Sequence, residues 1–353
     1  MELAIDVRHA DPVVVDEDQP ADAATHERLR GERAHAADPE HGDGRAAEAR
    51  DPVVADEAGG TIEASVGHGS HCILSSLIDT HCHLDLPAFD ADRDDVVARA
   101  AAAGVTGIVV PAIRPATWPA LLALGSAYPA LRPGHPEVRV ALGIHPQIVP
   151  ALAAAELPRT PRGAPDISRL ADLLIAAVAG AGAGVAIAIG ECGLDGGTPD
   201  PDAQEAILRA HVRAARVLRL PLIVHVLRAH DAAPRILGEE HAAEIGGVLH
   251  SYSGGAALVP RYRDLGFAFS FAGPVTYPNA RRPIEAARAV PAELLLAETD
   301  APDQAPAAHR GGRSEPAYLP DVIAGLAAAR GEAVADVAAR TTATARRIFG
   351  WPA

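Results

Sequence analysis

From residue 75 onward, short apolar runs of β-forming residues alternate with longer alanine-rich stretches. Eight such runs occur, at residues 77–79, 107–110, 138–142, 185–189, 222–224, 247–249, 267–271 and 294–297. The clearest intervening stretch, residues 204–220, has helical periodicity, and its apolar face is formed by Leu208, Val212, Ala215 and Leu218. Strands that alternate with helices predict an α/β fold, in which parallel strands are joined by right-handed crossovers.

The number of these units favours a closed barrel. Eight strand–helix units in about 280 residues match the size of a (β/α)8 TIM barrel, which we expect over residues 75–353. A doubly wound open sheet is the alternative. That fold is less favoured because no Gly-x-Gly-x-x-Gly sequence follows the first run.

Residues 1–74 differ from the rest of the chain, since they show no sustained period of 2 or 3.6. Residues 1–70 contain 17 acidic residues and 6 arginines, so most of the chain's net charge of −15 belongs to them. We expect residues 1–74 to be a disordered acidic extension whose removal leaves the fold and the activity nearly unchanged. A translation start further downstream is the alternative.

The remainder of the chain is close to charge balance, with 29 acidic residues and 25 arginines. This balance does not favour a protein that grips nucleic acid by charge alone. The chain contains no lysine. That absence excludes a Schiff-base lysine, a phosphate-loop lysine and a carbamylated lysine between two metal ions.

Cysteine usage and hydropathy bear on the compartment. The three cysteines, Cys72, Cys82 and Cys192, show no Cys-x-x-Cys spacing, which suits a reducing, cytoplasmic location. The N-terminus lacks the basic start and apolar core of a signal peptide. Residues 173–190 carry no charge, but they are mostly alanine and glycine. We interpret them as a helix end, a glycine turn and a buried strand, and we expect no membrane span.

Polar residues with ligand chemistry follow the apolar runs. They are His81 and His83 after the first run, His145 after the third, Glu191 after the fourth, His225 after the fifth, His250 after the sixth and Asp300 after the eighth. In a TIM barrel the C-terminal ends of all strands meet on one face, where the active site lies. One histidine at a strand end is usually structural, but four of these histidines, His81, His83, His225 and His250, with two carboxylates at the same end indicate a metal site.

The His-x-His pair has a direct physical use, because residues two apart on a strand point the same way. His81 and His83 can therefore share one divalent ion, and imidazole with carboxylate suits zinc or manganese and tolerates magnesium. Glu191 could bridge two such ions, with His225 and His250 on the second. Cys82 and Cys192 alternate with these side chains, so we expect them to face away as small core residues.

Asp300 completes the predicted catalytic pair with Glu191. It could hold the first ion and accept a proton from water as the general base. For a phosphate group, His145 and either Arg228 or Arg313 are the candidate binding residues, since arginine makes bidentate contacts to phosphate.

Taken in order, five segments resemble the TatD family of metal-dependent hydrolases, within the amidohydrolase-like barrels. They are Asp79-Thr-His-Cys-His-Leu-Asp85, Gly143-Ile-His-Pro146, Gly190-Glu-Cys-Gly-Leu-Asp195, His250-Ser-Tyr-Ser-Gly254 and Glu298-Thr-Asp-Ala-Pro302. The resemblance covers residues 76–350. It implies a metal-dependent deoxyribonuclease that binds a DNA 3′ end transiently, and it implies no obligate protein partner. It also implies that His81, His83, Glu191, His225, His250 and Asp300 are the metal ligands.

Two departures from the family pattern bear on the substrate. The family usually has His-x-Arg after the fifth strand, but Leu227 stands at that arginine's place and Arg228 follows it. Gly196 and Gly197 stand where the family often has an aromatic residue. The alternative to a nuclease is therefore a hydrolase of an amide, lactone or carboxylic ester, including aminoacyl-tRNA. A binding module with a vestigial site is a third interpretation, and the full ligand set argues against it.

Overall fold

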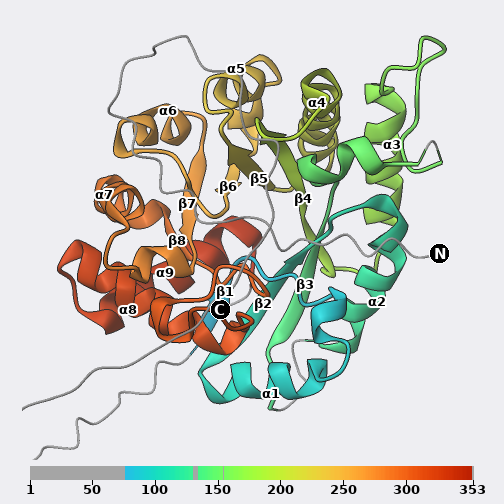
Figure 1. Cartoon of the computed structure of the whole chain (residues 1–353). Coiled ribbons are helices and arrows are strands. Elements are labelled where there is room, and N and C mark those ends of the chain that lie inside the picture. Colours follow the sequence, from blue (N-terminus) through green and yellow to red (C-terminus); the bar gives the residue numbers. More distant parts are fainter. Residues whose placement is uncertain (1–75, 130–133, 154, 352–353) are drawn as a thin grey trace, which may run out of the picture. The chain divides into compact units, whose positions relative to one another are not determined.

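The computed structural model describes residues 76–129, 134–153 and 155–351. The predicted extension, residues 1–74, and Cys72 lie outside this range. Eight parallel strands form one sheet in chain order (Figure 1). They are β1 Leu77–Asp79, β2 Val105–Pro111, β3 Glu137–Leu142, β4 Ala186–Asp195, β5 Leu222–Leu227, β6 Gly247–Leu249, β7 Phe267–Phe271 and β8 Leu295–Ala297. Each apolar run of the sequence corresponds to one strand.

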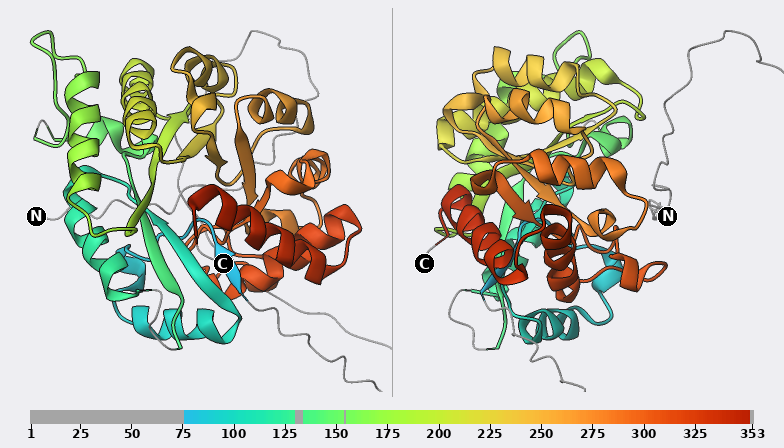
Figure 2. Two further views of the ribbon diagram at one scale, coloured as in Figure 1. Left: turned by 180° about the vertical axis from the view of Figure 1, so that it is seen from behind. Right: turned by 90° about the vertical axis from the view of Figure 1, so that its left-hand side faces the viewer.

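Helices form the outer ring around these strands (Figure 2). They are α1 Arg93–Ala102, α2 Trp118–Ala127, α3 Ile167–Ala179, α4 Pro201–Leu218, α5 Ala232–Glu239, α6 Val259–Arg263, α7 Arg281–Ala289, α8 Leu319–Arg330 and α9 Val334–Phe349. The arrangement is a TIM barrel, which confirms the prediction. In the described part of the chain, no helix combines the length and the apolar character that crossing a membrane requires.

Two apolar layers stabilise the barrel. One fills the space between strands and helices, and it contains Cys82 and Cys192, both without solvent exposure. The other lies inside the barrel and ends at Trp351, whose Nε1 donates to Glu137 Oε2 over 2.6 Å. A Cβ on Gly107 would lie 2.8 Å from the Trp351 ring. This packing closes the barrel at the end where the strands begin, so the site can form only at the other end.

Strands β8 and β1 meet just beyond their carboxyl ends. The Thr80 N–H donates to the carbonyl of Ala297 over 3.3 Å, and the Asp300 N–H donates to the carbonyl of His81 over 2.9 Å. The His83 N–H donates to the carbonyl of Ala301 over 2.8 Å. These hydrogen bonds join residues more than two hundred positions apart, and they place Asp300 beside the two histidines of the first strand.

Strand β4 is longer than the sequence predicts, because pairing with β5 resumes after a register shift between Ile189 and Cys192. Gly193 then pairs with His225, and a Cβ on Gly193 would lie 1.9 Å from the His225 carbonyl oxygen. Only glycine allows two backbones to approach so closely. Glu191 and His225 therefore lie within strands, where the ladder fixes their directions, rather than on the loops that follow.

Candidate metal centre

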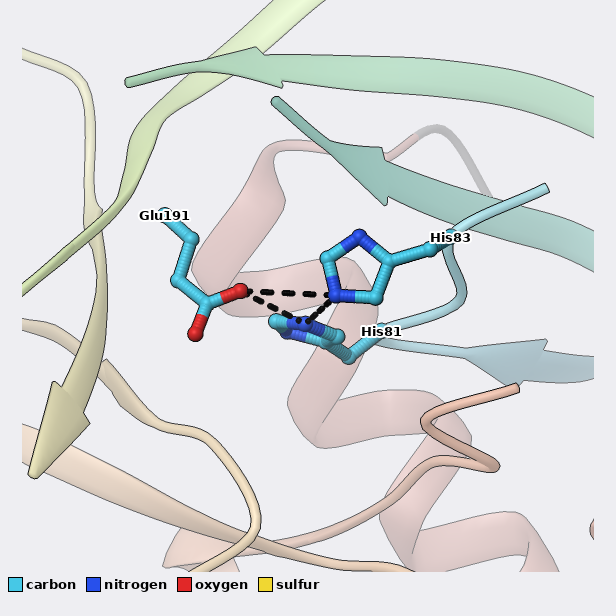
Figure 3. Close-up of side chains that lie close together, drawn as sticks. All are labelled: His81, His83 and Glu191. Atoms are coloured by element: carbon cyan, nitrogen blue, oxygen red, sulfur yellow. Dashed lines mark hydrogen bonds and ion pairs between the residues drawn. The ribbon is translucent and has the colours of Figure 1, made fainter. Parts of the chain in front are cut away.

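Glu191 is the centre of a histidine cluster at the carboxyl ends of the strands. Its side chain is fully buried, and its two oxygens face different groups. Oε2 lies 3.1 Å from His81 Nε2 and 3.5 Å from His83 Nε2 (Figure 3). The two imidazole Nε2 atoms are 3.2 Å apart. As the His-x-His spacing predicts, both rings point the same way and share one carboxylate oxygen.

The other oxygen of Glu191 faces three further histidines. Oε1 lies 2.6 Å from His250 Nε2, 2.9 Å from His145 Nε2 and 3.1 Å from His225 Nδ1. The nitrogens of His225 and His250 are themselves 3.1 Å apart. Because each carboxylate oxygen has its own histidine group, Glu191 has the geometry of a bridge between two adjacent cation positions.

Asp300 belongs to the first of these groups. Its Oδ1 lies 3.5 Å from His81 Nε2 and 3.8 Å from His83 Nε2. Its other oxygen, Oδ2, accepts a hydrogen bond from Gln304 Nε2. Gln304 in turn accepts a hydrogen bond from Ser251 Oγ over 2.8 Å, so the carboxylate is held between the loops that follow β6 and β8.

Burial and mutual charge shape the protonation of the cluster. Burial lowers the pKa of His81, and burial together with His81 lowers the pKa of His83 to about 3. Burial alone would raise the pKa of Glu191, but His145, His250 and His81 outweigh it and hold that pKa well below its usual range. The first group therefore consists of neutral imidazoles around an anion, which is the form that binds metal ions.

Three other groups of the cluster have raised pKa values: His225, His250 and Asp300. Burial lowers the pKa of His250, but the adjacent Glu191 and Glu298 raise it well above its usual value. Asp195 and Glu191 likewise outweigh burial and raise the pKa of His225. Burial raises the pKa of Asp300 well above its usual value, against the charge of His250. Neighbouring carboxylates therefore favour the protonated forms of His225 and His250, whereas burial favours the neutral form of Asp300.

The chemistry of this donor set fits divalent cations. Three overlapping groups have ligand atoms within 4.8 Å of one another, and they are His81–His83–Glu191, His81–His250–Asp300 and His145–Glu191–His225. Glu191 Oε2 is buried without a hydrogen-bond partner among the described residues. Converging imidazole nitrogens and carboxylate oxygens match zinc and manganese, and magnesium less closely.

The two predicted arginines lie outside this cluster. Arg228 is exposed at the end of β5, where its guanidinium is 3.6 Å from the Cβ position of Gly197. Arg313 donates to both Asp92 oxygens, at 2.8 and 2.7 Å, and to Glu315 over 2.8 Å. A phosphate group would have to displace two carboxylates from Arg313, so its contacts favour a structural role there.

Sequence reasoning assigned no role to the carboxylates that lie behind the second histidine group. Asp195 Oδ2 is 3.8 Å from His225 Nε2, and Glu298 Oε1 is 3.7 Å from His250 Nδ1. Carboxylates of this kind orient metal-bound imidazoles. One signal was available for Glu298, since it stands two residues before Asp300. Asp195 lies on the same strand as Glu191, but nothing in the sequence shows that it approaches His225.

Comparison with known proteins places this centre in context. The model of a protein family described as TatD related DNase matches residues 78–350. The metal-dependent hydrolase YcfH of Escherichia coli K12 is 35% identical over 280 residues, which cover 77% of this chain and 95% of that protein. The 3′-5′ ssDNA/RNA exonuclease TatD of Klebsiella pneumoniae is 32% identical over 289 residues, which cover 78% and 98%.

A solved structure agrees with these matches. The crystal structure of YjjV, a TatD homologue from Escherichia coli K12, superposes with a TM-score of 0.67 at 29% identity. The superposition covers 78% of this chain and 98% of that one. The chain therefore shares both the sequence pattern and the barrel architecture of these hydrolases over nearly their whole length.

Proposed function

Because the chain belongs to the TatD family of metal-dependent hydrolases, we propose that it hydrolyses phosphodiester bonds at the end of a DNA strand. The observation that carries this proposal is the division of Glu191 between two histidine groups, with Asp300 beside the first. A pair of adjacent cation positions is suited to an anionic ester, whose charge increases in the transition state. The exonuclease name of the Klebsiella relative points to the same substrate class.

Six residues would hold the metal ions, and they are His81, His83, Glu191, His225, His250 and Asp300. Two divalent ions of magnesium, zinc or manganese would supply positive charge that polarises the phosphate and lowers the pKa of water. The chain's own contribution is to orient these ligands. Asp195 and Glu298 lie behind His225 and His250 for that purpose.

Asp300 is the proposed general base. Its Oδ1 faces the reaction site, while Oδ2 accepts the Gln304 hydrogen bond and is fixed in direction. Burial raises the pKa of this carboxyl, so it accepts a proton more readily than an exposed aspartate would. Glu191 is less suited to the role, because the surrounding imidazoles hold its pKa well below the usual range.

His145 differs from the other histidines in its proton position. Its Nδ1 accepts a hydrogen bond from the Gln147 backbone N–H over 3.1 Å. In the neutral ring the proton must then lie on Nε2, which donates to Glu191 Oε1 over 2.9 Å. A metal ligand needs a free lone pair on the ligating nitrogen, so this arrangement favours His145 as a donor to a phosphate oxygen.

A second candidate function rests on the residues after β5. Leu227 stands where the family usually has an arginine, which removes one cation from the mouth of the barrel. That change favours a less charged substrate, such as a carboxylic ester, a lactone or aminoacyl-tRNA. The same metal centre would serve both chemistries, since the fold does not fix the substrate.

An activity screen of the metal-loaded full chain separates these candidates. The substrates are 5′-labelled single-stranded DNA, RNA, aminoacyl-tRNA and small esters, and the matched control is Asp300→Asn. We expect successive shortening of DNA from its 3′ end, loss of activity with a chelator and recovery when manganese or magnesium is restored. Faster turnover of the esters than of DNA, also abolished in Asp300→Asn, would replace the nuclease proposal with the alternative. A purified chain that holds well under one ion would contradict both.

A further inference from the structure

Arginines around the mouth of the barrel are distributed unevenly. Three exposed arginines lie in segments that follow β5, β7 and β8: Arg228 directly after β5, Arg282 at the start of α7 and Arg310 after β8. Within the described ranges, none of the three forms an ion pair with a carboxylate. We refer to Arg228, Arg282 and Arg310 as the rim arginines.

Each rim arginine lies against a segment of the site. Arg228 contacts Gly196 and Gly197, directly after Asp195. A side chain at Gly196 would collide with the backbone of Arg228, since its Cβ would lie 2.4 Å from the Arg228 carbonyl oxygen. The two glycines therefore leave space in which Arg228 lies beside the end of β4.

The other two rim arginines also lie near loops of the site. Arg282 Nε is 3.9 Å from the Cβ position of Gly255, on the loop that carries His250. The Arg310 guanidinium lies 5.1 Å from the centre of the Tyr277 ring. Tyr277 in turn donates from its hydroxyl to the carbonyl of Ala305 over 2.8 Å, five residues beyond Asp300. The rim arginines thus form an arc over β5 to β8.

The neighbouring side of the mouth, next to β1, carries paired arginines and additional carboxylates. There Arg93 is paired with Asp90 at 2.5 Å, and Arg313 is paired with Asp92 at 2.7 Å. Asp94 and Asp95 add negative charge in the first turn of α1. The exposed side chains of residues 228–231, 259–264, 281–285 and 303–310 include six arginines, which are the rim arginines with Arg261, Arg263 and Arg281, against four carboxylates, which are Asp231, Asp264, Glu285 and Asp303. A polyanion that enters the site is therefore attracted to the β5–β8 side and repelled from the β1 side.

We propose that the rim arginines bind successive phosphates of a single nucleic-acid strand whose end lies in the metal centre. This inference rests on the proposed function and adds the path of the strand. Guanidinium groups without carboxylate partners are free to contact phosphate oxygens, and the nearby Tyr277 ring offers a surface on which a base can stack. The three contacts are sequence-independent, as the trimming of any strand end requires.

The test is the salt dependence of binding of a fluorescent 12-nucleotide DNA strand with hydrolysis-resistant phosphorothioate linkages, measured by anisotropy on the metal-loaded full chain. The variant combines Arg228→Gln, Arg282→Gln and Arg310→Gln. For single strands each phosphate contact contributes about 0.7 to the slope of log affinity against log salt, so the slope should become shallower by about 2. The parental advantage should therefore increase about 100-fold between 1 M and 0.1 M salt.

The matched control is Arg219→Gln, since Arg219 is also exposed and has no ion-pair partner in the described chain, but it follows the C-terminal end of α4, away from the site. We expect parental slope and affinity for this control, and an unchanged metal content in both variants. An unchanged slope in the triple variant, or no binding by the parental chain, would overturn the inference. If the slope becomes shallower in the triple variant but the parental chain does not shorten ordinary DNA in the activity screen, the inference stands and only the proposed nuclease activity is rejected.

Discussion

Gln304 donates a hydrogen bond from Nε2 to Oδ2 of Asp300, and it accepts one from Ser251 Oγ over 2.8 Å. The proposed base is thus held by a residue four positions later and by a loop from another strand. The donor fixes the carboxylate so that Oδ1, rather than Oδ2, faces His81 and His83. The Ser251 contact cannot be read from the order of residues, because Ser251 and Gln304 lie 53 positions apart.

Replacing Gln304 tests whether this orientation matters for turnover. In Gln304→Leu the carboxylate loses a charge-assisted hydrogen bond of about 1.5–3 kcal/mol, so kcat should fall about 10- to 100-fold. Metal content should stay near the parental value, because the ligand atoms themselves remain. Ser251→Ala is the matched control. It should lower kcat less than Gln304→Leu does, since Gln304 can still donate to Asp300. Parental kcat in Gln304→Leu, measured beside metal content, would show that Asp300 needs no such support.

His211 supplies a prediction about stability and pH. It is fully buried on α4, its Nε2 accepts from the Ile144 N–H over 3.0 Å, and its Nδ1 donates to the Ile207 carbonyl over 2.7 Å. Burial lowers its pKa from 6.5 to about 4. Between these values the unfolded chain binds a proton that the folded chain does not, so stability decreases as pH falls through this window.

The size of this effect follows from the shift. Between pH 7 and pH 5, the free energy of unfolding should decrease by on the order of 2 kcal/mol because of His211. Urea unfolding of the parental chain and of His211→Gln at both pH values measures it. The variant should be less stable at pH 7, because Gln fits the two hydrogen bonds less well, but its stability should change less between the two pH values. An equal pH dependence in both proteins would contradict the assignment.

The barrel could be predicted from the sequence because parallel strands covered on both faces appear as continuous apolar runs. The rule that strand ends converge predicts from the sequence that His81, Glu191 and Asp300 are neighbours. The pairing of Arg313 with Asp92 could not be predicted in this way. It requires the start of α1 to lie beside the loop after β8, which is a property of the closed barrel rather than of any local pattern.

The extent of β4 and β5 shows a different limit. The predicted apolar runs stop at Ile189 and Val224, because Gly190 and Glu191 interrupt the first and His225 interrupts the second. The backbone ladder nevertheless continues to Asp195 and Leu227. Backbone hydrogen bonds do not depend on side-chain polarity, so apolar periodicity underestimates a strand wherever function places polar residues on it.

The two cysteines beside the proposed ligands should be structural. Cys82 and Cys192 have no solvent exposure, and burial raises the pKa of both thiols, which disfavours the thiolate that binds metal. Cys82→Ala or Cys192→Ala should therefore cost on the order of 1 kcal/mol of stability and leave metal content unchanged. Urea unfolding and metal analysis of each variant check this, and loss of an ion in either would make that cysteine a ligand.

Glu191 and Asp300 should respond differently to loss of charge. Glu191 faces both histidine groups, so Glu191→Gln should weaken metal binding at both positions and remove most activity. Asp300→Asn keeps an oxygen near His81 but cannot accept a proton, so it should retain much of its metal while kcat falls about 10²–10⁴-fold. Metal stoichiometry and kcat, measured on the same preparations, separate the two roles. Near-parental turnover in Asp300→Asn would assign the base to another residue, even with the barrel and its ligands unchanged.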